Sequence, residues 1–369
     1  MLSPKFASGD THLVMLRNSP GFSFFLLCFI IVIIQAQKYA IASIHENRTI
    51  MDVVNCSRIR IQINDKEILD PNENHMYARR TTTNPPFFIS MNNWEYDPMR
   101  KVVYDKGSYY EEDLTNVFTK ILRRSTPNSR VIDVGGNIGW FTFLSAANGH
   151  HVDVFEPNPV NIIRQCESMY LNGWTNALET DIRSRTSKRG SINLRQYGVG
   201  SFVTQLRLFM GKNPGAATVS LEGVPRRKRK ALRQNQLVDI ITLDGLADAL
   251  GFFRSKPSPI VILKVDVEGF EPSVFQGAQK LLRSGIVENI LMEVSGKRDN
   301  RQNEEMILLI QKSGYRLHGL GFSSGPTTAR LPNYRDEKEL VTLILTKVAG
   351  KGQQVNLWWK WNGRNNTFQ

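Results

Sequence analysis

Short apolar runs alternate along the chain with longer segments that have helical spacing. The apolar runs at residues 130–134, 152–155, 260–265 and 289–293 have the length of buried strands. Pro159 stands where proline is favoured, in the first turn of a predicted helix. Strands that alternate with helices in this way predict βαβ units, and therefore an α/β fold with a parallel sheet and helices on both faces.

The remaining elements follow from the same pattern. The full prediction is helices at 113–122, 139–147, 159–172, 272–283 and 303–313, and strands at 59–63, 130–134, 152–155, 177–181, 238–243, 260–265, 289–293, 315–320 and 339–345. The chain contains no internal repeat, so a solenoid or propeller is excluded and a single α/β domain is expected.

An uncharged apolar run, GFSFFLLCFIIVIIQA, occupies residues 21–36. A bilayer-spanning helix needs about 20 residues with a lower limit of about 17, so this run and its flanks are long enough. We therefore expect a membrane anchor at 21–38 after a short tail at 1–20. A cleaved signal peptide is the alternative, with tolerable cleavage sites near Ala36 and Ala42. Basic residues are nearly balanced on the two sides, so their count leaves the membrane orientation open.

Composition divides the rest of the chain into three parts. The polar residues 39–86 predict a stem, the regular pattern at 87–347 predicts a folded domain, and residues 348–369 form an aromatic tail that is expected to pack against it. Inside the domain, residues 185–235 interrupt the pattern and carry a basic run at 225–230. This basic insertion is either a solvated loop or a surface for an acidic glycan, phosphate or nucleic acid. Nucleic acid is disfavoured, because no aromatic residues alternate with the basic ones.

The amino-acid content narrows the class of protein. The 369 residues are 41% hydrophobic, which is too apolar for a disordered chain, and the formal net charge of +13 indicates an anionic partner or surface. Three cysteines cannot staple a fold of this size. Cys56 and Cys166, the two that follow the apolar run, could pair or stay free. Glycosylation sequons at Asn47, Asn55 and Asn365 are compatible with a lumenal domain.

A glycine-containing turn, VIDVGGNIG at residues 131–139, joins a predicted strand to a helix. Glycines allow the backbone to turn sharply and approach a ligand, and the start of the helix presents free N–H groups. Asn137 stands where the dinucleotide-binding fingerprint G-x-G-x-x-G requires its second glycine. A nicotinamide-dependent oxidoreductase is therefore the less favoured alternative.

Acidic residues stand at or just beyond the carboxyl ends of five predicted strands. In an open parallel sheet, ligands bind outside these ends, so we expect the acids to meet at one edge. Such an edge repels a pyrophosphate but suits a cationic ligand that carries sugar hydroxyls. S-adenosylmethionine, with a sulfonium, an ammonium and a ribose, has this chemistry. The acids are Asp133, Glu156, Asp181, Asp266, Glu268 and Glu293.

Two blocks of the sequence resemble FkbM-type methyltransferases, a family of S-adenosylmethionine-dependent enzymes that mostly methylate hydroxyl oxygens. The first is VIDVGGNIGWFTFLSAANGHHVDVFEPN at 131–158, and the more specific second block is LKVDVEGFEPSVFQG at 263–277. A weaker match is GSYYE at 107–111, similar to the segment that precedes the family's first strand. The resemblance implies a Rossmann-like methyltransferase fold, with a mostly parallel seven-stranded sheet, an antiparallel last strand and helices on both faces.

The resemblance also implies roles for individual residues. Glu156 would hold the ribose, Asp181 or Ile182 would lie beside the adenine, and Asp133 would face the amino group through water. The glycine turn would back the methionyl portion of the cofactor. The complete cofactor-binding set implied in this way is Asp133, Gly135, Gly136, Asn137, Gly139, Glu156, Asp181, Ile182, Tyr110 and Glu111.

Methyl transfer to a hydroxyl benefits from a base, and a positioned carboxylate contributes about 10²–10⁴-fold in rate. The candidates are Asp266, Glu268 and Glu271, since close acids raise one another's proton affinity. The alternative is a structural role, in which Glu271 begins the helix at Pro272 and Glu268 pairs with Lys264. A divalent ion on Asp266, Glu268 and Glu293 would suit hard oxygen ligands, but nothing else in the sequence supports it, and no metal is expected.

These patterns predict a single-pass, membrane-tethered, S-adenosylmethionine-dependent O-methyltransferase of the secretory pathway, with its domain in the lumen of the Golgi or the endoplasmic reticulum. The expected substrate is a hydroxyl on a saccharide or acidic glycoconjugate, because the chain is strongly basic. If the apolar segment is cleaved, the enzyme is secreted. The alternative from another class is a membrane-tethered binding protein for acidic polymers with an inactive methyltransferase core.

Overall fold

The computed structural model describes residues 52–56, 77–91, 99–105, 109–174, 190–210, 218–220, 234–253, 259–295, 300–320, 337–348 and 354–363. All of them belong to one unit, Ile50–Gln369. Several predicted features lie outside the described residues: the membrane anchor at 21–38, the strands at 59–63 and 177–181, Asp181, Ile182 and the basic run at 225–230. Among the helices that are described, none combines the length and the apolar character needed to cross a bilayer.

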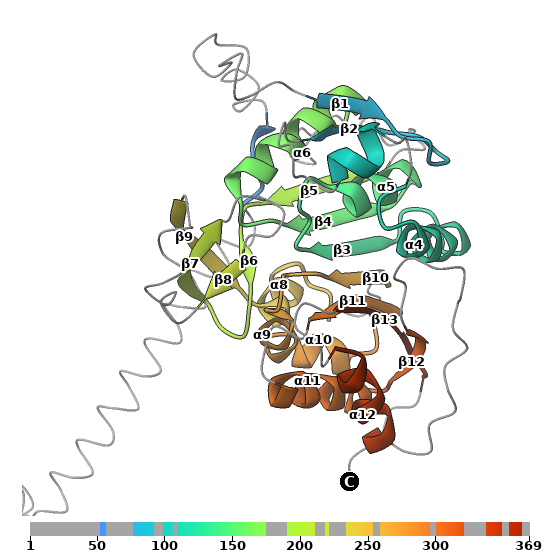
Figure 1. The fold of residues 1–369 in the computed structure, drawn as a ribbon, viewed down its shortest axis with the longest axis vertical. Coiled ribbons are helices and arrows are strands. Elements are labelled where there is room, and N and C mark those ends of the chain that lie inside the picture. The colour runs from blue at the N-terminus through green and yellow to red at the C-terminus, as the bar shows by residue number, and fades with distance from the viewer. Residues whose placement is uncertain are drawn as a thin grey trace, which may run out of the picture. The chain divides into compact units, whose positions relative to one another are not determined.

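A seven-stranded sheet forms the centre of this unit (Figure 1). Its strand order is β12-β13-β11-β10-β3-β4-β5, and only β13 runs antiparallel to the others. The predicted mostly parallel sheet with an antiparallel last strand is therefore confirmed. The strands are β3 Arg130–Val134, β4 His151–Phe155, β5 Ser191–Arg195, β10 Ile260–Val265, β11 Asn289–Ser295, β12 Tyr315–Leu320 and β13 Gln354–Trp361.

Helices cover both faces of this sheet, because its central strands are apolar on both sides. Every residue of β10 is buried. Alternation along β3 sends Val131 into one apolar layer and Ile132 and Val134 into the other. Helices α4 Glu112–Arg124, α5 Trp140–Ala147 and α6 Pro159–Asn172 pack on the first face; α8 Leu243–Ala249, α9 Glu271–Gln276, α10 Gln279–Arg283, α11 Asn300–Lys312 and α12 Glu337–Val348 pack on the second.

The last strand differs from its predicted position. Residues 339–345 lie in helix α12, not in a strand, because Leu340, Val341 and Ile344 have helical spacing and all three are buried. The antiparallel strand is β13, which lies within the aromatic segment 348–369. Buried and partly exposed residues alternate along β13, and Trp359 is fully buried.

A second, four-stranded sheet arises from the segment that interrupts the βα pattern. Its order is β6-β9-β7-β8, from β6 Gly198–Val199, β7 Thr204–Met210, β8 Thr218–Ser220 and β9 Gln234–Ile241. Leu208 and Ile240 on its inner face pack against Phe270, in the loop after β10. The strand predicted at 238–243 thus exists as part of β9, but it belongs to this small sheet and not to the main one.

The helix predicted at 272–283 is two short helices, α9 and α10, which are separated at Gly277 and Ala278. A side chain at Gly277 would have its Cβ 2.0 Å from the carbonyl oxygen of Gly200. The chain before β7 therefore presses directly on the α9–α10 junction. Ser201 strengthens this contact, since its backbone N–H donates to the hydroxyl of Ser273 at 3.2 Å. These contacts fix the small sheet beside the carboxyl end of β10.

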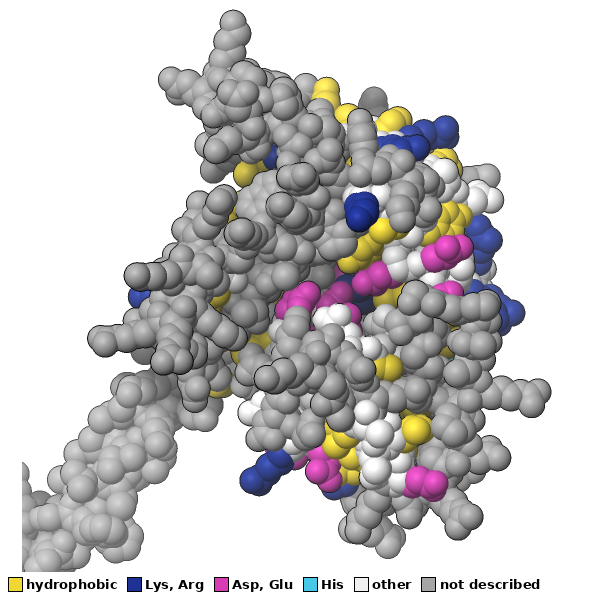
Figure 2. Space-filling view, viewed as in Figure 1, with side chains coloured by type: hydrophobic (Ala, Val, Ile, Leu, Met, Phe, Trp, Pro, Cys, Tyr) yellow, Lys and Arg dark blue, Asp and Glu magenta, His cyan; other side chains and the backbone are white. Residues whose placement is uncertain are grey.

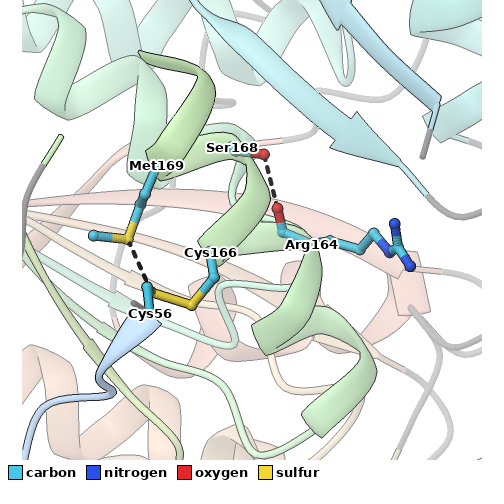
Figure 3. Close-up of a disulfide and its surroundings, with 5 residues drawn as sticks. All are labelled: Cys56, Arg164, Cys166, Ser168 and Met169. Atoms are coloured by element: carbon cyan, nitrogen blue, oxygen red, sulfur yellow. Dashed lines mark hydrogen bonds between the residues drawn. A yellow bond between two sulfur atoms is a disulfide. The ribbon is translucent and has the colours of Figure 1, made fainter. Parts of the chain in front are cut away.

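A disulfide between Cys56 and Cys166 ties an early segment of the chain to α6 (Figure 3). The Cys56 sulfur lies 3.8 Å from the Met169 sulfur, and the neighbouring Val54 donates its N–H to the Leu194 carbonyl at 2.7 Å. The antiparallel pair β1 Tyr77–Arg80 and β2 Phe88–Met91 also contacts α6, through Ser90. The pairing of the two cysteines, which their spacing left open, is thereby resolved.

Replacing both cysteines with alanine should lower the free energy of unfolding by about 2–5 kcal/mol, since the bond restricts the unfolded chain over a long loop. The two cysteines are 110 positions apart. Urea denaturation of the full chain measures the loss, and the wild type in a reducing agent should show the same shift. A double variant as stable as the oxidised wild type would show that the bridge adds no stability.

Candidate active site

The glycine turn after β3 touches the loop after β10. Gly135 has φ +80°, and a Cβ at this position would lie 1.8 Å from the carbonyl oxygen of Asp266. Only glycine satisfies both the left-handed backbone and this close approach. The N–H groups of Gly135 and Gly136 both donate to the Phe155 carbonyl, at 2.9 and 3.1 Å. The turn is thus held between the ends of β4 and β10, and Gly139, with φ +99°, is the N-cap of α5.

Glu156, which follows β4, fixes the shape of this turn. One carboxylate oxygen accepts from the backbone N–H of Asn137 at 2.7 Å, and the other accepts from that of Asn158 at 2.8 Å. Asn137 is itself left-handed, with φ 48°, and Gln165 donates to its carbonyl. Each carboxylate oxygen has a second lone pair, so Glu156 can accept further bonds from a ligand. Burial raises the pKa of Glu156 to about 7, although the two N–H donors oppose this rise.

A buried lysine on β10 pairs with two of the predicted acids. The Lys264 nitrogen lies 3.6 Å from an oxygen of Asp133 and 3.4 Å from an oxygen of Asp266. Burial alone would lower the pKa of Lys264, but the carboxylates of Asp266, Asp133 and Glu111 raise it, so the lysine stays charged. Asp133 is fully buried and also accepts from the Thr142 hydroxyl at 2.6 Å. One oxygen of Asp133 is therefore hydrogen-bonded to protein, while the other pairs with Lys264 without a hydrogen bond.

Three further carboxylates lie near Asp266 and Lys264. We call Glu111, Asp266, Glu268 and Glu293 the acid cluster. Burial first, and then Asp266, raises the pKa of Glu111. Burial first, and then Asp266 and Glu268, raises the pKa of Glu293, whose oxygen Oε1 is buried without a hydrogen-bond partner among the described residues. Acidic side chains gather beside basic ones on the face shown in Figure 2. One lysine does not balance this many acids, so the acid cluster favours a cation.

The three predicted bases occupy different environments. The Asp266 side chain is 29% exposed at the end of β10. Glu268 has a left-handed backbone, with φ 56°, a strained conformation for a residue with a side chain. Glu271 is 1% exposed, and one of its oxygens accepts from the N–H groups of Val267 and Gly269, each at 3.0 Å. Glu271 holds the loop in place, so it is not available to a substrate, whereas Asp266 is.

The predicted entry segment lies against both halves of the site. Tyr110 packs its ring on Trp140, the first residue of α5, with 6.3 Å between ring centroids, and its side chain bonds to the carboxylate of Glu111. Trp140 donates to the Thr115 hydroxyl at 2.8 Å, which in turn donates to the Tyr110 carbonyl. The segment therefore links the glycine turn to the acid cluster.

The structure brings together most of the predicted site residues, with Asp181 and Ile182 lying outside the described residues. Sequence reasoning missed the closeness of Glu111 to Glu293. It offered Glu268 as a partner of Lys264, whereas the ion pairs that the structure gives for Lys264 are with Asp133 and Asp266. A signal for Lys264 was present, because a lysine inside a buried apolar run is rarely unpaired.

The buried acids predict that the ligand-free domain becomes less stable as pH rises from 6 to 8. The pKa values of Glu156 and Glu271 are raised to about 7, against 4.5 as the ordinary value, so the folded state binds more protons than the unfolded state in this range. The contribution of these two carboxyl groups to the free energy of unfolding is largest at and below about pH 4.5. It falls as pH rises and is lost above about pH 7. Tm measured between pH 6 and 8 tests this.

The Glu156→Gln/Glu271→Gln double variant is the control, because its glutamines do not titrate. Its Tm should fall less between pH 6 and 8 than that of the wild type. Equal slopes for the two proteins would contradict the prediction.

Comparison with protein families points to one group. The model described as the methyltransferase FkbM domain matches residues 133–317, half of the 369-residue chain. The matched segment contains the glycine turn, Glu156 and the loop after β10. No curated protein matches the chain.

The solved structures to which this chain is similar include methyltransferases. A protein from Streptococcus mutans assigned as a SAM-dependent methyltransferase is 11% identical, with a TM-score of 0.36, 78% of this chain covered and 56% of that one. The SAM-dependent methyltransferase from Agrobacterium tumefaciens is 11% identical, with a TM-score of 0.35 and coverages of 80% and 73%. The TehB-like methyltransferase from Corynebacterium glutamicum is 7% identical, with a TM-score of 0.31 and coverages of 70% and 92%. The chain thus spans little more than half of the first of these proteins.

Proposed function

This chain belongs to the FkbM methyltransferase family, whose cofactor is S-adenosylmethionine, and on that premise we propose that it methylates a hydroxyl oxygen of a saccharide or glycoconjugate. Membership of this family indicates methyl transfer, whereas the nicotinamide-dependent alternative would require hydride transfer. The methylated atom and the class of substrate are the parts that we propose.

The charge balance of the acid cluster is the observation that supports this assignment. The Glu293 oxygen Oε1 is buried without a hydrogen-bond partner among the described residues. Burial first, and then neighbouring carboxylates, raise the pKa values of Glu111 and Glu293. A cation bound beside these acids would lower their mutual repulsion. The cofactor carries a sulfonium and an ammonium, so these residues fit it. Glu156 would hold the ribose diol with its remaining lone pairs, and the backbone of the glycine turn would contact the methionyl portion. Asp133, which is bonded to protein groups, would act on the ammonium only indirectly.

Asp266 is the base that the geometry favours. When bound, the cofactor supplies a methyl group already activated on sulfur. The protein then has to align the hydroxyl and accept its proton. Asp266 is partly exposed, and the charged Lys264 of β10 pairs with its carboxylate. Glu268, two residues along the same loop, is the second candidate, while Glu271 positions that loop.

The proposed acceptor is an acidic saccharide, because the chain carries a net charge of +13. The small sheet supports an extended acceptor, since it packs on the loop that carries Asp266 and Glu268 and so adds a wall beside the site. The basic run at 225–230 lies in the connection between β8 and β9 of this sheet. A glycan that carries carboxylates or sulfates would complement these charges.

The disulfide supports placement in an oxidising compartment. Disulfides persist in the secretory pathway and outside cells, and are rare in the cytosol. We therefore propose that the domain lies in the lumen of the Golgi or the endoplasmic reticulum, anchored by residues 21–38. Secretion after cleavage of that segment is the alternative.

Transfer of a labelled methyl group tests the proposed function. The full chain, produced with its disulfide, is incubated with methyl-labelled S-adenosylmethionine and a panel of acidic and neutral oligosaccharides. Label should enter an acidic oligosaccharide as an alkali-stable methyl ether. Label found only in lipid or on protein nitrogen would overturn the proposed acceptor. Binding of acidic oligosaccharides without any transfer would favour a binding protein with an inactive core.

A further inference from the structure

A cavity of about 370 Å³ opens at the edge of the main sheet opposite the acid cluster. It is lined by the end of α4, the loop before β3, the starts of β10 and β11, and side chains of β12 and β13. These are the amino ends of parallel strands, whereas the candidate active site lies at their carboxyl ends. The volume is at the lower end of the range for small-molecule sites, which is about 300–1,000 Å³. The cavity is therefore separate from the methyl-transfer site.

Positive charge dominates the lining of this cavity. Lys120 and Arg124 stand one turn apart on α4, and Lys360 reaches the cavity from β13. Glu288 is the only carboxylate among the described lining residues. Within the described part of the chain, no ion pair to a carboxylate is formed by any of the three cations. Like charges at this helical spacing destabilise a helix. A bound anion would reduce the repulsion between Lys120 and Arg124.

The sheet adds to the same charge. Arg316 on β12 lies directly opposite Lys360 on β13, and like charges directly opposite each other destabilise an antiparallel pair. His318 of β12 also lines the cavity, and burial first, and then Lys360 and Lys120, lowers its pKa. Cations from α4 and β13 therefore line one cavity, although they come from distant parts of the sequence.

The wall of the cavity is rigid and partly aromatic. Trp358 donates its indole N–H to the Asn289 side chain at 3.0 Å, and the amide of Asn289 donates to the Val261 carbonyl at 2.9 Å. His318 packs edge-on against Trp358, with ring centroids 4.3 Å apart. An aromatic wall beside cationic side chains suits a small polar molecule that has both an apolar face and a negative group.

We propose that this cavity binds a small ligand through an oxyanion, with Lys120, Arg124 and Lys360 contacting the negative group and Trp358 lining its apolar side. A carboxylated sugar, a sugar phosphate and the inorganic anions share this chemistry. The site is independent of methyl transfer, because it lies at the opposite edge of the sheet.

Titration calorimetry of the full chain distinguishes these ligands. The probes are glucuronate, glucose 6-phosphate, inorganic phosphate and inorganic sulfate, with neutral glucose as the reference. At least one anionic probe should bind at least tenfold more tightly than glucose. Tight binding of phosphate or sulfate alone would support the site and identify the inorganic anion as the ligand. If no anionic probe binds more tightly than glucose, the proposal is wrong.

The Lys120→Gln/Lys360→Gln variant should bind that probe at least tenfold more weakly than the wild type, with unchanged affinity for S-adenosylmethionine. The matched control is Lys101→Gln/Lys312→Gln, which removes the same charge at exposed lysines that do not line the cavity. An equal loss in both variants would mean that net charge attracts the anion without a site. Unchanged binding in the cavity variant would also overturn the proposal. If the cavity variant lost affinity for S-adenosylmethionine but still bound the anion, the cavity proposal would be wrong, and the two lysines would instead affect the methyl-transfer site.

Discussion

Asp266→Asn should reduce kcat for methyl transfer by about 10²–10⁴-fold, the contribution of a positioned general base. Asparagine keeps the size of the side chain but cannot take the proton of a hydroxyl. The carboxylate of Asp266, in the loop after β10, is partly exposed, and one of its oxygens lies 3.4 Å from the Lys264 nitrogen. Rates at saturating donor and acceptor give kcat, and calorimetry with S-adenosylmethionine separates any change in donor affinity from the change in rate.

Two neighbouring variants complete this experiment. Glu268→Gln removes the second candidate base, and a larger loss of kcat in this variant than in Asp266→Asn would transfer the role to Glu268. Glu271→Gln should mainly lower Tm, since Glu271 accepts bonds from two N–H groups of the loop. Full activity in Asp266→Asn would exclude it as the base.

Glu156→Ala should weaken the binding of S-adenosylmethionine by about 10–100-fold, since hydrogen bonds to a charged group are worth about 1.5–3 kcal/mol and each 1.4 kcal/mol is a factor of ten. Glu156 is 5% exposed, and its carboxylate connects the glycine turn to the chain after β4. The variant loses both the ribose acceptor and the support for Asn137. Calorimetry with the full chain measures the dissociation constant.

Glu167→Gln is the matched control for this variant, because Glu167 is also a buried carboxylate. Glu167 pairs with Arg164 at 2.7 Å and with the Ser90 hydroxyl, away from the glycine turn. Glu167→Gln should lower Tm without changing cofactor affinity. If Glu156→Ala binds the cofactor as tightly as the wild type, Glu156 does not contact it.

Local patterns predicted most helices and strands of the domain correctly. Pro159 begins α6 as expected, with Asn158 accepting from the N–H of Val160. The apolar run of β10 is buried along its whole length, as its composition required. The prediction was wrong at 339–345, where Leu and Val fit a strand as well as a helix in a short window. The segment is a helix in the structure, because β13 occupies the position in the sheet between β11 and β12 that this segment would need as a strand.

The chain's sequence by itself determined the α/β class, the glycine turn and the presence of acids at the strand ends, because periodicity and turn chemistry act between neighbours in the chain. Only the tertiary structure decided which acids share a site, which of them the loop occupies, and that Cys56 meets Cys166. Those outcomes depend on contacts between segments far apart in sequence and on how much water each carboxylate loses, and neither quantity is encoded in local spacing.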